Sequence, residues 1–238
     1  EMNDQVVLRS VFKDMTLTSN LSIDDLVVND VKLGKAKFGL NNLLSPNEFA
    51  ADISMSYVLP NSNKVLPLSI KGKVNLKDEK NNLDLKVNMQ DFDISLIENY
   101  LSSLSSYVRG KISTENLLVK GKFTQPHIAG SLKIKDGAMK IDMLNTTYSF
   151  NDELFVNDNI FTMDNFVLQD AQKNKITING TITHDNFTNF DLNLKAKADK
   201  IKVLDTEESV DQMYYGTVYA SADVNLHGDL NFLNIEVT

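Results

Sequence analysis

The chain of 238 residues has no cysteine, no tryptophan and only 4 prolines. The lack of cysteine excludes disulfides, thiolate metal sites and cysteine nucleophiles. No apolar run approaches the roughly 20 residues that a membrane-spanning helix needs, and residues 1–10 lack the pattern of a signal peptide. Because residues 230–238 end within an alternating strand pattern, we expect the sequence to be a fragment of a longer chain.

Positive charge is also scarce, because 24 Lys and Arg residues stand against 32 Asp and Glu residues, which gives a net charge of −8. A protein that binds nucleic acid needs a basic surface to neutralise phosphates. We therefore expect no nucleic-acid partner and assign the acidic side chains to a solvated surface.

The dominant pattern is the alternation of apolar and polar residues. Residues 83–89 are Leu-Asp-Leu-Lys-Val-Asn-Met, and the same rhythm recurs at 176–182, 190–196 and 218–226. A period of two is typical of strands with one apolar and one polar face. Short runs of Asn, Asp, Ser and Gly separate these segments and favour turns. The sequence therefore predicts an all-β, antiparallel protein of about fourteen strands.

One segment has helical features instead. Ser95 and Glu98 form a capping box, and Gly110 fits a C-terminal cap. The apolar stripe between them consists of Ile97, Leu101, Leu104 and Val108. These features predict one amphipathic helix near 95–109.

A glycine stands at the centre of an apolar-x-Gly-x-apolar pattern five times in the sequence. The five are Gly72, Gly121, Gly130, Gly180 and Gly228. A glycine on the apolar face of a strand lets the sheet bend sharply or lets another backbone approach. We therefore expect a sheet that curls toward its apolar side. Two of these patterns begin a longer repeat, because residues 72–87 and 180–194 align with one gap.

A single helix cannot cover the apolar faces of so many strands, so the sheet must fold over on itself. A closed barrel, a two-sheet sandwich and an open trough all satisfy this requirement. An open trough would bind lipid or apolar polypeptide through the aliphatic residues beside the glycines, whereas a closed fold would bury the same residues in a dry core. The candidate lining residues are Ile70, Val74, Val119, Phe123, Ile128, Leu132, Ile134, Ile178, Ile182, Leu226 and Leu230.

Catalytic patterns are weak throughout. His127, His184 and His227 have no second ligand at a metal-binding spacing, and Asp84 and Asp191 lie on polar strand faces. There is no nucleophile elbow and no phosphate-binding glycine loop. We therefore predict that the protein is not an enzyme and uses no cofactor or metal.

Four segments resemble the TamB family, the inner-membrane-anchored component of the translocation and assembly module. They are "GKISTENLLVKGKFTQPHIAGSLKIKDGAMKI" with the following "LNTTYSFNDE", the run from "NDNIFTMDN" to "KVLDT", and "YYGTVYASADVNLHGDL". The similarity covers residues 65–238, and residues 1–64 share only the strand rhythm. Asn174 and Ala222 stand where glycine is common in the family. The asparagine-rich composition and the segment from "LDT" to "YYG" are similar to those of Bacteroidetes-type members.

The resemblance implies a continuous, elongated unit with an N-terminal β segment, 1–64, and a TamB-like segment, 65–238. It implies a curved sheet folded like a taco around a hydrophobic groove, in a periplasmic protein anchored in the inner membrane. The implied function is outer-membrane biogenesis together with a TamA-like or BamA-like barrel partner. Two roles are implied: carrying phospholipid between the membranes, or assembling outer-membrane protein clients, including autotransporters. A scaffold of the second kind would bind clients through a strand edge and would not need lipid.

A surface adhesin or carbohydrate-binding sandwich is a further alternative. Such a protein would prefer aromatic side chains on an exposed face, and the absence of tryptophan therefore disfavours it.

Overall fold

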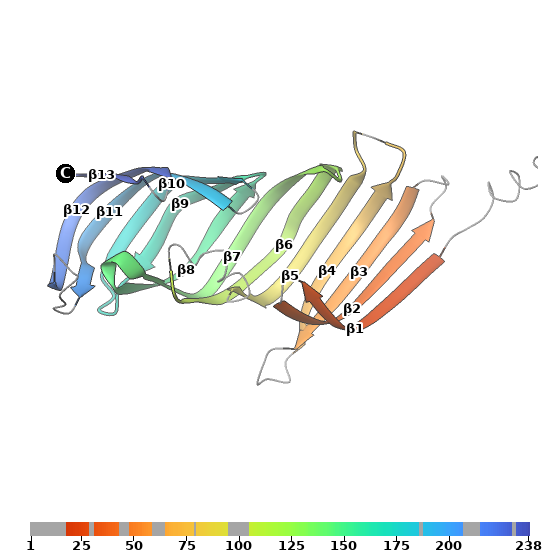
Figure 1. Ribbon diagram of the computed structural model, residues 1–238, viewed down its shortest axis with the longest axis horizontal. Helices are drawn as coiled ribbons and strands as arrows, with labels where there is room; N and C mark the ends of the chain where they lie inside the picture. Colours follow the sequence, from red (N-terminus) through yellow and green to blue (C-terminus); the bar gives the residue numbers. More distant parts are fainter. Residues whose placement is uncertain are drawn as a thin grey trace, which may run out of the picture. The chain divides into compact units, whose positions relative to one another are not determined.

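A computed structural model describes residues 18–28, 31–42, 48–58, 65–78, 80–94, 105–185, 188–206, 215–229 and 232–238. Its strands form one open sheet of 13 strands, in which each strand lies beside its neighbours in sequence (Figure 1). The strands are β1 (Thr18–Val28), β2 (Val31–Asn42), β3 (Glu48–Val58), β4 (Val65–Asn75), β5 (Leu83–Asp93), β6 (Val108–Lys122), β7 (Gln125–Ile141), β8 (Thr146–Asn157), β9 (Ile160–Gln169), β10 (Lys175–Asp185), β11 (Thr188–Thr206), β12 (Gly216–Asp229) and β13 (Asn234–Val237).

The all-β class and the antiparallel order are as the sequence predicts. Antiparallel hairpins need only short connections, and the short polar turns between the alternating segments provide them. The 3-10 helix η2 (Asp142–Leu144) is the only helical element longer than one residue in the described part of the chain. No helix within the described ranges is long and apolar enough to cross a membrane.

The predicted helix near 95–109 is not found where the structure can test it. Residues 95–104 lie outside the described residues, and residues 105–109 are not helical. The backbone N–H of Lys140 donates to the carbonyl oxygen of Tyr107 at 3.0 Å, and β6 begins at Val108. Val108 and Ile112 are 3% and 9% exposed, so both bury the same face of a strand. Gly110 lies within this strand and caps no helix.

The chain contacts divide the protein into two compact units. Unit 1 contains the strands up to Gln90 together with the hairpin Glu115–Ile128, and unit 2 contains Asp91–Thr114 and Ala129–Thr238. These units do not coincide with the division at residue 64 that the resemblance implies, and that division stays a prediction.

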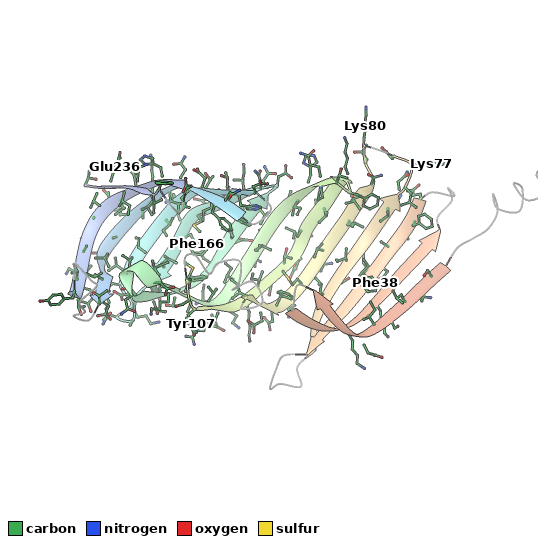
Figure 2. The ribbon with its side chains drawn as sticks, viewed as in Figure 1. Phe38, Lys77, Lys80, Tyr107, Phe166 and Glu236 are labelled. Atoms are coloured by element: carbon green, nitrogen blue, oxygen red, sulfur yellow. The ribbon has the colours of Figure 1, made fainter. Side chains whose placement is uncertain are left out.

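Regular pairing is characteristic of β2–β5 in unit 1, whereas the pairing of β1 with β2 has register shifts between Ile23 and Leu26 and between Leu26 and Val27. The registers of β2 with β3, β3 with β4 and β4 with β5 run without a shift. Lys71 pairs with Asp52 at 3.4 Å on the exposed polar face. Lys77 and Lys80 project from the turn between β4 and β5 (Figure 2). An unshifted register keeps every second side chain on the same face along the whole strand.

Bulges are characteristic of unit 2. Apart from Asn189 at the start of β11, four strand residues have a left-handed backbone with φ near +50°, namely Asp91 in β5, Asp136 in β7, Asn165 in β9 and Lys200 in β11. The N–H of each donates to a side-chain oxygen on the next strand: Ser113 at 3.0 Å, Asn151 at 2.6 Å, Asn179 at 2.7 Å and Ser221 at 2.9 Å, respectively. A bulge bends its strand and increases the local twist. Four of them on alternate strands favour strong bending within this unit.

Candidate functional site: the apolar face of the sheet

The apolar face of unit 1 is not covered by a second layer of described structure. Ile53 on β3 pairs with Ile70 on β4, and Ile70 pairs with Val87 on β5, so the three form a row across the sheet. All three are half-buried. We call the large, half-buried apolar residues on this face of β3, β4 and β5 in unit 1 the open apolar face. They are Phe49, Ile53, Leu68, Ile70, Val74, Leu83, Leu85, Val87 and Met89.

Full burial is rare among the residues of unit 1 whose burial the structure describes. Ala51, with 5% exposure, is the only fully buried hydrophobic residue among them. A packed core buries its aliphatic side chains far more completely than this. The open apolar face therefore retains contact area for an apolar partner.

Unit 2 has a packed core on the apolar side of its strands. Phe150, Phe166, Ile178, Leu194 and Ala196 form one buried cluster from β8 to β11. The rings of Phe150 and Phe166 lie 5.7 Å apart at an interplanar angle of 48°, and Figure 2 labels Phe166 within this unit. In this unit β8 contacts β11, although the two strands are not neighbours in the sheet.

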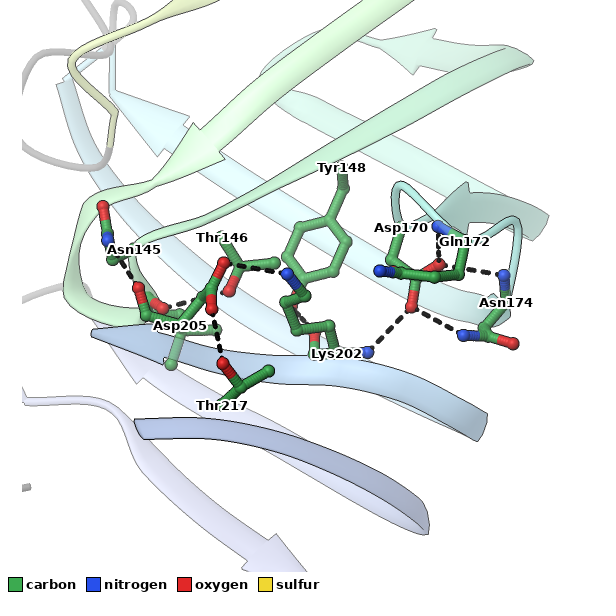
Figure 3. A network of polar contacts seen from close by, with 10 residues as sticks. Asn145, Thr146, Tyr148, Asp170, Gln172, Asn174, Lys202, Asp205 and Thr217 are labelled. Carbon is green, nitrogen blue, oxygen red and sulfur yellow. Dashed lines mark hydrogen bonds and ion pairs between the residues drawn. The ribbon is translucent and has the colours of Figure 1, made fainter. Parts of the chain in front are cut away.

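Tyr148 of β8 contacts β11 across the apolar face. The residue is 6% exposed, and it packs with Ala198 and Ile201 of β11. Its hydroxyl donates a hydrogen bond of 2.7 Å to the carbonyl oxygen of Lys202 (Figure 3). Beside it, Nδ2 of Asn145 donates to the carbonyl oxygen of Asp205 at 2.5 Å. Burial, followed by the nearby negative charge of Asp170, raises the pKa of Tyr148 to about 12.

Asp170 fixes the turn that lies next to Tyr148. Its carboxylate is in a residue only 2% exposed and accepts hydrogen bonds of 2.9 Å from four groups: N–H of Gln172, N–H and Nδ2 of Asn174, and N–H of Lys202 (Figure 3). Burial raises the pKa of the carboxyl group, but these hydrogen bonds outweigh it and hold the pKa below its usual value. Asn174 is therefore a double partner of this carboxylate, through its N–H and its Nδ2.

An ion pair continues the network toward solvent. Nζ of Lys202 lies 2.8 Å from a carboxylate oxygen of Asp205, whose other oxygen accepts a hydrogen bond of 2.8 Å from Thr217. The hydrogen bond with Asp205 raises the pKa of Lys202, and the one with Lys202 lowers the pKa of Asp205. These groups tie β11 to β12.

The structure distributes the predicted lining residues over both units. Ile178 is buried in the core cluster at 8% exposure, Phe123 is 50% exposed, and Leu230 lies outside the described residues. Ile134, Ile182 and Leu226 pack against the buried cluster of unit 2. The half-buried members are Ile70, Val74, Val119, Ile128, Leu132, Ile134, Ile182 and Leu226. A groove lined by the whole set stays a prediction.

All five glycines have positive φ, from +89° at Gly121 to +155° at Gly72. Two of them correspond in the sequence repeat and share one environment. A Cβ at Gly72 would collide with the carbonyl oxygen of Asp84 and lie 2.8 Å from Cα of Leu85. A Cβ at Gly180 would collide with the carbonyl oxygen of Asn193 and lie 2.9 Å from Cα of Leu194. Both therefore permit a close backbone approach, and their effect on sheet bending stays a prediction. Gly130 and Gly228 have φ of +152° and +112°.

The three histidines lie on different strands, His127 on β7, His184 on β10 and His227 on β12. His184 is 8% exposed, with Phe161 at 4.8 Å and Phe190 at 6.0 Å between ring centres. Burial lowers the pKa of His184, against a smaller opposite effect of Asp185. His127 and His227 are exposed, as are Asp84 and Asp191. Within the described ranges no three His, Asp or Glu side chains gather as metal ligands do.

Comparison with models of known protein families finds a match in the C-terminal part of the chain. The family model described as the TamB C-terminal domain matches residues 164–238, from within β9 to the end of β13. No curated protein and no solved structure matches the chain. The domain match covers the segment that holds Asp170, Lys202 and the β12 strand, and it supports the assignment of this chain to the TamB family.

Proposed function

We propose that the chain is a non-enzymatic, periplasmic segment of a TamB-like protein that carries phospholipid between the inner and outer membranes. The TamB domain supports a role in building the cell envelope. In the proposed mechanism, acyl chains lie on the apolar side of the sheet, and a TamA-like or BamA-like barrel receives the cargo at the outer membrane.

The observation that carries the proposal is the open apolar face. Its rows of half-buried aliphatic side chains continue across β3, β4 and β5 without a register shift. Each methylene group of an acyl chain that such a surface removes from water contributes about 0.8 kcal/mol. Equivalent rows side by side would let a chain move from one to the next without a large barrier.

The first experiment is to purify the protein from bacteria, extract it with organic solvent and identify lipids by mass spectrometry, alongside native mass spectrometry of the intact protein. Stoichiometric phospholipid is the expected result. A matched pair of variants locates it, because Ile70→Gln and Lys71→Gln place the same side chain on opposite faces of β4. We expect only the first to lose lipid. A lipid-free mass with no uptake from added vesicles would contradict the proposal.

A second candidate function is strand pairing with outer-membrane protein clients, and the edge of β12 favours it. Within this sequence, β13 and Thr238 pair with Asp223–His227 of β12, and no described strand pairs with Gly216–Ala222 on that side. Val218 and Tyr219 on this stretch are each 44% exposed. Such an edge offers backbone groups to an extended peptide.

Binding of a fluorescent peptide with alternating valine and threonine tests this candidate. The control is the same peptide with alternate backbone nitrogens methylated, which removes its hydrogen-bond donors but not its apolar side chains. Binding of the unmodified peptide alone supports strand pairing. Equal binding of both peptides, or of neither, contradicts it.

A further inference from the structure

The residues that join β8 to β11 form a polar and aromatic closure over part of the apolar side of unit 2. We call Asn145, Tyr148, Lys202 and Asp205 the clasp. Two hydrogen bonds to carbonyl oxygens hold it, from Tyr148 to Lys202 at 2.7 Å and from Asn145 to Asp205 at 2.5 Å. β9 and β10 lie between β8 and β11 in the sheet, so the clasp spans two strands.

The clasp covers apolar surface that would otherwise resemble the open apolar face of unit 1. Leu168 of β9 and Ile176 of β10 pack against the cluster of Tyr148, Ala198 and Ile201. The Tyr148 ring therefore occupies space over β9 to β11 that an acyl chain would have to enter. Asp170 holds the β11 side in place, because it accepts the N–H of Lys202 at 2.9 Å.

We infer that the clasp excludes apolar cargo from β9–β11, so that Tyr148 is the positioning residue that confines cargo to the rest of the apolar surface. This inference rests on the proposed function for the identity of the cargo. The exclusion itself is a property of the fold, because a ring that is 6% exposed and tied to a carbonyl oxygen leaves no room for a second apolar group.

Photolabelling of the whole chain with a small aliphatic diazirine tests the exclusion without assuming any lipid. In the unmodified protein, peptide mass spectrometry should find label on β3–β5 and little on β9–β11. Tyr148→Ala removes the ring from a buried site and should raise labelling of β9–β11 at least about tenfold. Tyr107→Ala is the matched control, since Tyr107 is a 39% exposed tyrosine of the same unit.

Two further variants cover the case in which Tyr148→Ala does not fold. Tyr148→Phe and Asn145→Ala each remove one hydrogen bond of the clasp and keep the core filled. Each should speed hydrogen exchange of the amides of 202–206 about fivefold and raise diazirine labelling of β9–β11 in proportion.

The outcomes separate the clasp from the proposed function. Equal labelling of β3–β5 and β9–β11 in the unmodified protein overturns the exclusion, as does a folded Tyr148→Ala variant without a gain. A parallel experiment replaces the free diazirine with vesicles of phosphatidylcholine that carries the diazirine in its acyl chain. Diazirine labelling as expected, with no phospholipid labelling in any variant, overturns the proposed function and leaves the clasp as a closure of the apolar face.

Discussion

The hydroxyl of Tyr148 on β8 donates a hydrogen bond of 2.7 Å to the carbonyl oxygen of Lys202 on β11, and the two strands β9 and β10 lie between β8 and β11 in the sheet. An open sheet with no covering helix among the described residues thereby encloses a core in unit 2. The phenol is buried beside the carboxylate of Asp170, and this environment raises the pKa of Tyr148 to about 12.

This pKa predicts a loss of stability in alkaline solution. The tyrosine pKa in the unfolded chain is about 10. The contribution of Tyr148 is therefore fully present below pH 10 and is lost as pH rises toward 12, because only the unfolded state then releases the proton easily. Urea unfolding between pH 8 and 12 should show a steeper fall for the unmodified protein than for Tyr148→Phe. A Tyr107→Phe control should follow the unmodified protein, and identical pH profiles for all three would contradict the prediction.

Asp170 predicts the opposite dependence at acid pH. Burial opposes its ionised form, but hydrogen bonds from the side chain of Asn174 and the N–H groups of Lys202, Asn174 and Gln172 outweigh burial and lower the pKa. Its contribution is present above the unfolded pKa of about 3.9 and is lost as pH falls through the folded value.

Asp170→Asn should lower the free energy of unfolding at pH 7 by roughly 2–4 kcal/mol, because an amide replaces one carboxylate acceptor with a donor that faces N–H groups. The difference from the unmodified protein should shrink as the pH approaches 3. Asp164→Asn, an exposed carboxylate on β9, is the control and should change stability by less than about 0.5 kcal/mol. A pH-independent difference between Asp170→Asn and the unmodified protein would argue that the charge of Asp170 is not what matters.

The alternation of apolar residues was sufficient to predict strands and their antiparallel order. It also contained the bulges, which the prediction missed. In β9 the apolar positions are odd at Phe161 and Met163 and even at Phe166 and Leu168. The change of parity is the signal of one extra residue, and Asn165 with φ of +51° lies at the change.

The remaining errors have physical causes. The helix prediction gave local capping patterns more weight than pairing, yet Val108 and Ile112 are buried as strand residues in β6. The clasp was beyond sequence reasoning, because Tyr148 and Lys202 are 54 residues apart and lie on strands that are not neighbours in the sheet. The prediction considered only glycines as sites where a strand can bend. It therefore missed the four bulge residues, which are Asp, Asn or Lys.

Gly180 allows a test of close backbone approach that is separate from backbone strain. Gly180 and Gly216 both have positive φ, +137° and +119°. A Cβ at Gly180 would collide with the carbonyl oxygen of Asn193, whereas a Cβ at Gly216 has nothing within 4 Å. Gly216→Ala should therefore cost only the conformational strain, about 1–2 kcal/mol.

Gly180→Ala should cost at least about 3 kcal/mol, because β10 and β11 must separate to admit the methyl group. Chemical denaturation of the two variants measures both costs. Equal losses would mean that strain accounts for the effect and that strand contact at Gly180 adds nothing.

Ile70 and Ile178 provide the sharpest comparison between the two units, because both precede by two residues a glycine of the same pattern. Ile178 is 8% exposed in the core cluster, so Ile178→Ala should lower the free energy of unfolding by about 2–5 kcal/mol. Ile70 is half-buried on the open apolar face, and Ile70→Ala should cost roughly 1 kcal/mol, since less apolar area is lost. Phospholipid uptake should fall in Ile70→Ala, whereas a folded Ile178→Ala should retain it. Uptake that depends on Ile178 and not on Ile70 would place the cargo surface in unit 2 and would contradict both the proposed site and the exclusion by the clasp.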